Sequence, residues 1–267
     1  MNRRDFIRNI PKLKEIYVIH SQATKLPFVF CHEDTMDDYV VICTKEEAAR
    51  EKAQALIGEK KPALVVKCRE KEIAQMFGSL KVLGVNAVQF IGREPGEDYL
   101  VQVGEFLRWQ DFSGQPAEKR PVENPGLQLS LLYFLQEYRR AADAPGRGDV
   151  QELSEEVYVN MTRSRFLLGA QPVEDEARKE QSALLLVKNK EGEAFLPLFT
   201  DVFELKRFTK DKPPKQIIAA DFKRVLTLLN QGETAGVVLN PGSGNYPVSR
   251  EKYMEIDEAF APEEEKI

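Results

Sequence analysis

The chain has 267 residues, of which 42% are hydrophobic, and its 38 basic and 43 acidic side chains leave a formal net charge of −5. This length and apolar content fit two domains of ordinary size and exclude a chain that is disordered throughout. The mild acidic balance gives no overall attraction to nucleic acid or to an anionic membrane, so we expect neither as a partner.

The cysteine content and the apolar runs favour a cytoplasmic location. The three cysteines, Cys31, Cys43 and Cys68, contain no Cys-x-x-Cys pair. That odd number argues against a disulfide scaffold or a structural zinc site and favours a reducing compartment. No apolar run approaches the roughly 18 residues that a membrane span needs. We therefore expect a soluble, cytoplasmic protein without a metal or a cofactor.

Residues 12–107 alternate between strand-like and helix-like segments. Two β-prone runs, 28–31 and 39–43, flank a polar turn and predict a hairpin. Thr44, followed by acidic residues and alanines, predicts the N-cap of a helix that ends near Gly58.

The rest of this region continues the alternation. A strand is predicted at 63–66, followed by a helix that Gly84 closes. The apolar face of that helix has i, i+3, i+4, i+7 spacing: Ile73, Met76, Phe77 and Leu80. A strand at 85–91, a turn at 92–98 and a further strand at 99–103 complete the region.

The middle of the chain reads as a linker and two helices. Gly and Pro residues interrupt the polar stretch between 108 and 125. Residues 127–142 predict an amphipathic helix whose polar side includes Gln136 and Arg140. Residues 150–165 carry another helix or a helix–strand transition.

From residue 182 the alternation returns. We expect a buried strand at 183–187 and a strand at 195–199, in which Pro197 indicates an edge or a bulge. A helix then begins at Thr200-Asp201. The segments that follow are a short strand at 217–218, a helix over 222–229 stopped by Gly232, a strand at 235–239, a Gly-rich turn at 240–244 and an acidic tail at 263–265 that we expect to fray.

The two halves of the chain resemble each other. A shift of 156 positions places Tyr39 on Phe195 and Thr44 on Thr200, and a shift of 149 places Ile73 on Phe222. The order of elements is the same in both halves, which favours a tandem duplication over chance similarity of two α/β segments. We predict an α/β (α+β) fold with two similar mixed-sheet domains in tandem and helices packed on each sheet. The first domain would cover residues 1–112, the linker 113–126 and the second domain 127–267.

Two short motifs in the second half carry a family resemblance. The motifs are Phe-Leu-Pro-Leu-Phe-Thr-Asp at 195–201 and, about forty residues later, Gly-Val-Val-Leu-Asn-Pro-Gly at 236–242. The region from about 127 to 253 resembles the SseB, or enhanced serine sensitivity, family, and the first half resembles a diverged copy. The resemblance implies a compact α/β domain, often in tandem, without established catalytic residues.

No catalytic pattern stands out. The two histidines, His20 and His32, lie in no metal-binding spacing, and we read His32 as part of a solvated turn. The chain contains no P-loop, no strand followed by Gly-x-Gly-x-x-Gly, and no Gly-x-Ser-x-Gly elbow. Cys43 precedes a predicted helix, where a thiolate would be stabilised, but a small apolar core residue is the simpler interpretation.

The Gly-rich turn is the best candidate for a binding surface. Its backbone amides could form an anion-binding nest, although a plain turn, in which Asn240 tolerates a left-handed backbone, explains the same residues. The candidate surface comprises Thr200, Asp201, Asn240, Pro241, Gly242, Ser243 and Gly244.

Three functions remain open from the sequence. The leading hypothesis is a noncatalytic, protein-binding or regulatory module of the bacterial cytoplasm. The alternative is a small-anion sensor or an enzyme that uses the 240–244 turn, which requires polar groups such as Thr200, Asp201 and Arg250 to converge there. The third is a self-associating scaffold. The sequence identifies neither the partner nor the oligomeric state.

Overall fold

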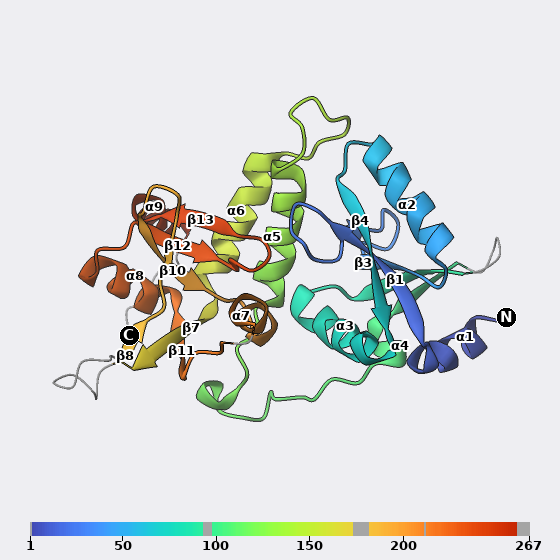
Figure 1. Ribbon diagram of the computed structural model, residues 1–267, viewed down its shortest axis with the longest axis horizontal. Coiled ribbons are helices and arrows are strands. Elements are labelled where there is room, and N and C mark those ends of the chain that lie inside the picture. Colours follow the sequence, from blue (N-terminus) through green and yellow to red (C-terminus); the bar gives the residue numbers. More distant parts are fainter. Residues whose placement is uncertain (1, 93–97, 173–181, 211, 261–267) are drawn as a thin grey trace. The chain divides into compact units, whose positions relative to one another are not determined.

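A computed structural model describes residues 2–92, 98–172, 182–210 and 212–260 (Figure 1). Most of the expected turn at 92–98 and the acidic tail at 263–265 lie outside these residues. Among the described helices, none is both long and apolar enough to cross a bilayer.

The chain divides into two compact units. The first consists of Met1–Arg120 and Gln128–Leu153, and the second of Pro121–Leu127 and Ser154–Ile267. Residues 128–153 therefore belong to the first unit, whereas the sequence-based division placed them in the second domain. Helix α5 (Pro125–Tyr138) and helix α6 (Val150–Thr162) each pass from one unit to the other. The division into domains at 1–112 and 127–267 stays a prediction.

The first unit is built on a six-stranded sheet. Its strands are β1 (Glu15–Ser21), β2 (Val29–Cys31), β3 (Asp38–Cys43), β4 (Ala63–Arg69), β5 (Ala87–Ile91) and β6 (Tyr99–Gln102). The order is β4-β1-β3-β5-β6, and β2 also pairs with β3. The β3–β5 pair is parallel and the other pairs are antiparallel. The helical segments are α1 (Arg3–Asn9), η1 (Ile10–Lys12), α2 (Glu46–Gly58), α3 (Glu70–Leu83), α4 (Val103–Phe106) and η2 (Ala117–Lys119).

Helices cover both faces of this sheet (Figure 1). Because side chains alternate along a strand, Ile16 and Val18 of β1 join the core beneath α3. Tyr17 and Ile19 join the second core, which contains the buried residues of α2. Strand β1 is thus buried on both faces, and for that reason its near-continuous apolar run lacks the alternation that marks a half-exposed strand.

The second unit contains two smaller sheets. Its strands are β7 (Arg165–Pro172), β8 (Ser182–Leu184), β9 (Val187–Lys188), β10 (Ala194–Leu198), β11 (Gln216–Asp221), β12 (Gly236–Leu239) and β13 (Tyr246–Ser249). The orders are β13-β12-β10-β9 and β11-β7-β8, and a single bridge between Leu167 and Phe199 joins β7 to the end of β10. Apart from α6, the helices are α7 (Val202–Thr209), α8 (Phe222–Gln231) and α9 (Arg250–Phe260).

The strand registers of the two units correspond. In the parallel β3–β5 pair Tyr39 lies opposite Ala87, and in the parallel β10–β12 pair Phe195 lies opposite Gly236. These are the positions that the shifts of 156 and 149 relate to each other. The mixed α+β class is confirmed, and the shared register supports the duplication, which stays an interpretation.

Several local predictions need correction. Strands β1, β7 and β13 and helix α9 were not predicted. Helix α2 begins after Lys45 rather than Thr44, since the Thr44 hydroxyl donates to the Ile91 carbonyl at 3.4 Å instead of capping the helix. Residues 183–187 form no buried strand, because the residues of the short β8 are exposed or half-buried and Leu186 is exposed. Pro197 lies on β10 between β12 and β9, but β9 pairs only as far as Phe195, so no ladder bond to β9 is lost at the proline.

Candidate functional site

The predicted surface forms where two parallel strands end. Strand β10 ends at Leu198 and β12 at Leu239, and the Asn240 N–H continues the ladder by donating to the Leu198 carbonyl at 2.9 Å. Parallel strands end at the same edge of a sheet. Thr200, just beyond β10, therefore lies next to Asn240, just beyond β12.

Asn240 and Thr200 share two hydrogen bonds. The Thr200 N–H donates to Asn240 Oδ1, and Asn240 Nδ2 donates to Thr200 Oγ1, each at 3.0 Å. The Thr200 hydroxyl in turn donates to Asp201 Oδ2 at 2.8 Å. All three residues are buried. Asn240 adopts the left-handed backbone (φ 47°) that the sequence led us to expect.

Asp201 opens helix α7, as predicted. Its Oδ1 accepts hydrogen bonds from the N–H groups of Phe203 and Glu204, at 2.8 and 3.1 Å, which caps the helix. Burial raises the pKa of this carboxyl, and the hydrogen bonds from Thr200 and from the helix amides partly oppose that rise.

Glu204 is a member of this cluster that the sequence analysis missed. It is buried on α7, and its Oε2 accepts a hydrogen bond from the Ser243 hydroxyl at 2.5 Å. Arg207 Nε lies 3.4 Å from its Oε1. Burial raises the pKa of Glu204 to about 7. The Asp-x-x-Glu spacing from Asp201 is a capping-box pattern, which predicts a solvated helix start rather than a buried acid.

The Gly-rich turn packs against the end of α7. Ser243 N–H and Asn245 N–H both donate to the Asn240 carbonyl, at 3.0 and 2.9 Å. A Cβ on Gly242 would lie 3.0 Å from the backbone nitrogen of Phe208, so a side chain here would push the turn and α7 slightly apart. Pro241 and Gly242 are half-buried, and Ser243 and Gly244 are buried.

Two further residues show where the cluster ends. Asn124, which the sequence analysis also missed, donates from Nδ2 to the carbonyls of Thr200 at 2.7 Å and Arg165 at 2.6 Å. Arg250 donates instead to the carbonyls of Gly232 and Thr234, at 2.6 and 2.7 Å. The structure thus brings Thr200, Asp201, Asn240 and the turn together, and it gives Arg250 hydrogen bonds elsewhere.

The hydrogen bonds of this cluster join the ends of β10 and β12 to the start of α7, which indicates a structural role rather than a ligand site. The two carboxyl groups accept their hydrogen bonds from the protein itself, and a negative charge on either of them opposes a bound anion. The corresponding positions of the first unit do not form this side-chain cluster. The Thr44 N–H donates to the backbone carbonyl of Ile91 at 3.1 Å, and Lys45 occupies the position that corresponds to Asp201.

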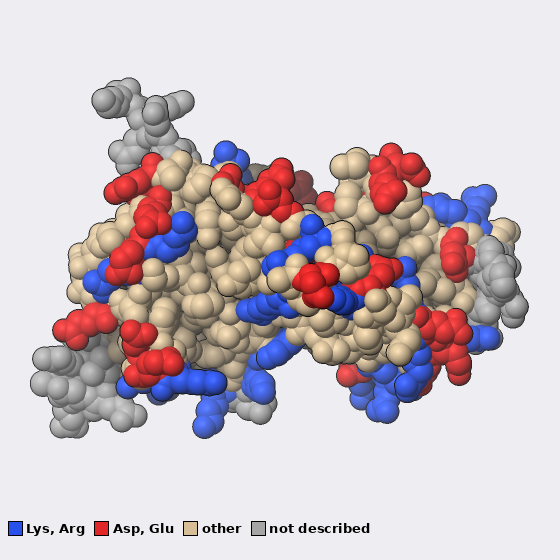
Figure 2. Space-filling model, turned by 90° about the horizontal axis from the view of Figure 1, so that it is seen from above, with Lys and Arg blue, Asp and Glu red and all other residues tan. Residues whose placement is uncertain are grey.

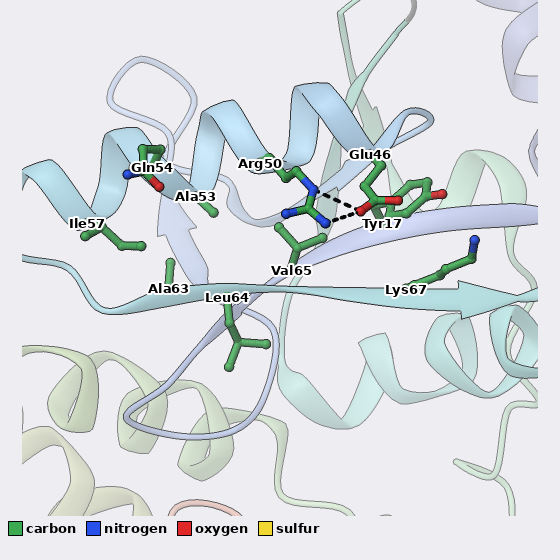
Figure 3. A pocket seen from close by; sticks show the side chains of 10 residues that line it. All are labelled: Tyr17, Glu46, Arg50, Ala53, Gln54, Ile57, Ala63, Leu64, Val65 and Lys67. Carbon is green, nitrogen blue, oxygen red and sulfur yellow. Dashed lines mark hydrogen bonds and ion pairs between the residues drawn. The ribbon is translucent and has the colours of Figure 1, made fainter.

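A second candidate lies on the first unit, between α2 and β4. A cavity of about 340 Å³ opens there. It is lined by Tyr17, Glu46, Arg50, Ala53, Gln54, Ile57, Ala63, Leu64, Val65 and Lys67. Figure 3 shows Val65 and Lys67 rising from β4 towards the helix, whereas Leu64 points away from it.

The rim of this cavity is charged and its floor is apolar. Arg50 forms an ion pair with Glu46 on the same helix (Figure 3). Lys67 Nζ lies 2.6 Å from Glu15 Oε2, and this partner, followed by the Tyr17 hydroxyl, lowers the pKa of Glu15. Ile57 leaves 46% of its surface exposed beside the opening. No sequence motif marked this region, since its residues come from three separate segments.

Comparisons with known proteins support the family resemblance. Residues 139–252 match the family model of the SseB protein N-terminal domain. No curated protein matches the chain. The solved structure "Anabaena Tic22 (protein transport)" is 13% identical, with 98% of this chain and 100% of that chain covered and a TM-score of 0.23. "Tic22 from Plasmodium falciparum" is 12% identical, with 94% and 96% covered and the same TM-score of 0.23. Neither likeness carries an argument at this TM-score.

Proposed function

We propose, from the match of residues 139–252 to the family model of the SseB protein N-terminal domain, that the protein is a noncatalytic, protein-binding module of the bacterial cytoplasm. The observation that carries the proposal is the cavity between α2 and β4. We propose that an extended segment of a partner protein lies in this groove.

Strand β4 offers the backbone for such a segment. It is the end strand of the order β4-β1-β3-β5-β6, and its seven residues pair in full with β1 on one side. An extended peptide can add to an end strand through main-chain hydrogen bonds while neighbouring pockets select its side chains. The groove beside α2 supplies such a pocket.

The lining favours an apolar side chain within the bound segment. Ala53, Ile57 and Val65 provide apolar surface, whereas the charges of Arg50 and Lys67 are balanced by Glu46 and Glu15. A cavity of about 340 Å³ lies at the lower end of the range for ligand sites, about 300–1,000 Å³, and suits one or two side chains.

Other observations support the remaining parts of the proposal. All three cysteines are free, which fits a reducing compartment. Basic and acidic side chains intermingle on the face shown in Figure 2, which gives no single-sign field for nucleic acid. The buried carboxyls of Asp201 and Glu204 already accept hydrogen bonds from protein donors, which supports a structural role for them.

The test is site-specific photocrosslinking in cells, with the photoreactive residue at Ile57 and, as a control, at the more exposed Met36. We expect a recurrent crosslinked protein at 57 only. A synthetic peptide that covers the crosslinked segment should then bind the purified chain, and Ile57→Lys should weaken binding about tenfold or more, because it places a charge at the apolar wall. Equal affinity of the wild-type and Ile57→Lys chains for that peptide would refute the proposal that the peptide binds in this groove.

The alternative, a small-anion sensor or an enzyme at the 240–244 turn, has one observation in its favour. The raised pKa of Glu204, about 7, is a value suited to proton transfer. Titration with inorganic phosphate, followed by NMR of the Gly242 and Gly244 amides, separates the two proposals, since saturable shifts at these amides would favour the alternative.

A further inference from the structure

Strand β11 leaves one side of its sheet uncovered. It ends the order β11-β7-β8, and all six of its residues pair with β7 on one side. In the part of the chain that the structure describes, no strand pairs with its other side. Ile217 and Ile218 keep 50% and 37% of their surfaces exposed, and since they are neighbours they lie on opposite faces of the strand.

The composition of this edge is unusual for an end strand. Proteins commonly protect such edges with charged side chains, because an unprotected strand is a template for pairing with another chain. Strand β11 carries no charge from Gln216 to Ala220.

The charges that flank β11 are complementary to those of a second copy. Lys215 precedes the strand, Asp221 ends it, and both are exposed. In an antiparallel pair of two copies centred on Ile218, Lys215 of each copy lies opposite Asp221 of the other. Ile217 then lies opposite Ala219, and Ile218 lies opposite its own counterpart. A parallel pair in register would place like charges together, which is unfavourable.

We propose that β11 pairs edge to edge with β11 of a second copy of this chain, antiparallel and about a two-fold axis at Ile218. The pairing joins two three-stranded sheets into one six-stranded sheet. The interface is isologous, since the same strand contributes from both copies, and it therefore closes at a dimer. It uses the second unit alone and is independent of the peptide groove on the first.

The first test is the oligomeric state of the full chain, measured by sedimentation velocity over a range of concentrations. We expect a monomer–dimer equilibrium. Ile218→Lys, which places two positive charges against each other at the axis, should shift the dissociation constant upward at least tenfold. Leu186→Lys, at an exposed leucine outside the strand, is the matched control and should leave it unchanged. A wild-type chain that stays monomeric, or an Ile218→Lys chain that dimerises as well as wild type, would overturn the proposal.

The second test fixes the register. In a Cys31→Ser background, which removes the exposed native thiol, Ile218→Cys places a thiol opposite itself and should give a disulfide-linked dimer under mild oxidation. Ile217→Cys places the two thiols two positions out of register and should crosslink far less. Equal crosslinking at both positions would refute the two-fold register. Unchanged thermal unfolding of each variant shows that the fold is intact.

Discussion

The side chain of Asn240 holds Thr200 by two hydrogen bonds of 3.0 Å, one to its backbone N–H and one to its hydroxyl. The bonds join the ends of two parallel strands that are about forty residues apart in the chain. The Thr200 hydroxyl donates a hydrogen bond to Asp201, the N-cap of α7. The start of α7 therefore depends on the turn after β12. Substitutions at the turn should therefore affect the stability of the second unit as a whole.

Asn240→Asp should destabilise the second unit. The substitution tolerates the left-handed backbone, but it loses the donor to Thr200 Oγ1 and adds a third carboxylate to a buried cluster. We expect the free energy of unfolding to fall by about 2–4 kcal/mol in urea denaturation. Asn245→Asp is the control, since Asn245 shares the φ of 47° but is exposed, and it should cost less than about 1 kcal/mol. An equal loss of unfolding free energy at the two positions would contradict a stabilising role for the hydrogen bonds between Asn240 and Thr200.

Glu204 should make stability depend on pH. Its pKa is about 7 in the folded protein and 4.5 for the ordinary group, so between these values the folded state holds a proton that the unfolded chain has lost. The free energy of unfolding should therefore be highest below about 4.5 for this group and fall as pH rises towards 7, by an amount on the order of 2–3 kcal/mol. The raised pKa of Asp201 acts in the same direction.

Glu204→Gln isolates that contribution. Glutamine resembles the protonated acid and can still accept the hydrogen bond of Ser243, so the variant should lose most of the decline between pH 4.5 and 7. Urea denaturation at several pH values measures the slope. A variant whose slope matches that of the wild type would show that Glu204 titrates normally.

Gly242→Ala should weaken the packing of the turn against α7. The added methyl would meet Phe208 N at 3.0 Å and Phe208 Cα at 3.2 Å, both of them backbone atoms. A cost of about 1–3 kcal/mol in thermal or urea unfolding is expected. Gly114→Ala is the control, because nothing lies within 4 Å of the added carbon, and it should be nearly neutral.

Arg140→Ala should be among the most damaging changes in the first unit. The side chain is fully buried, with an ion pair to Glu137 and hydrogen bonds to the carbonyls of Glu59 at 3.2 Å and Pro145 at 2.8 Å. We expect a loss of about 3–5 kcal/mol, since the substitution removes a buried side chain, its hydrogen bonds to these carbonyls and the charge that pairs with the half-buried Glu137 carboxylate, which keeps a hydrogen bond from the Gly148 N–H. Arg140→Lys should recover little, because an ammonium cannot reach these groups as the guanidinium fork does. Arg50→Ala, at an exposed pair, should cost under about 1 kcal/mol.

The elements that sequence reasoning placed well are those with a strong local signal. The face of α3, from Ile73 to Leu80, is buried as its spacing predicted, and Gly84 ends the helix with the left-handed φ of 81°. Strand β1 escaped prediction although residues 16–19 form a continuous apolar run, the pattern that a strand buried on both faces shares with a buried helix segment. In the site, Asp201 was placed correctly as the start of a helix, whereas Glu204 and Asn124 have partners about forty residues away or more.

By itself the sequence determined the mixed class of the fold and the resemblance of the second half to the SseB family, and it suggested the correspondence between the two halves. These follow from apolar spacing, helix caps and short motifs, which act over a few residues along the chain. Tertiary structure decided which polar residues are buried and which strand edges stay open. The burial of Arg140 and Glu204 and the exposure of β4 and β11 depend on segments distant in sequence, because a side chain or a strand is covered only by what folds against it.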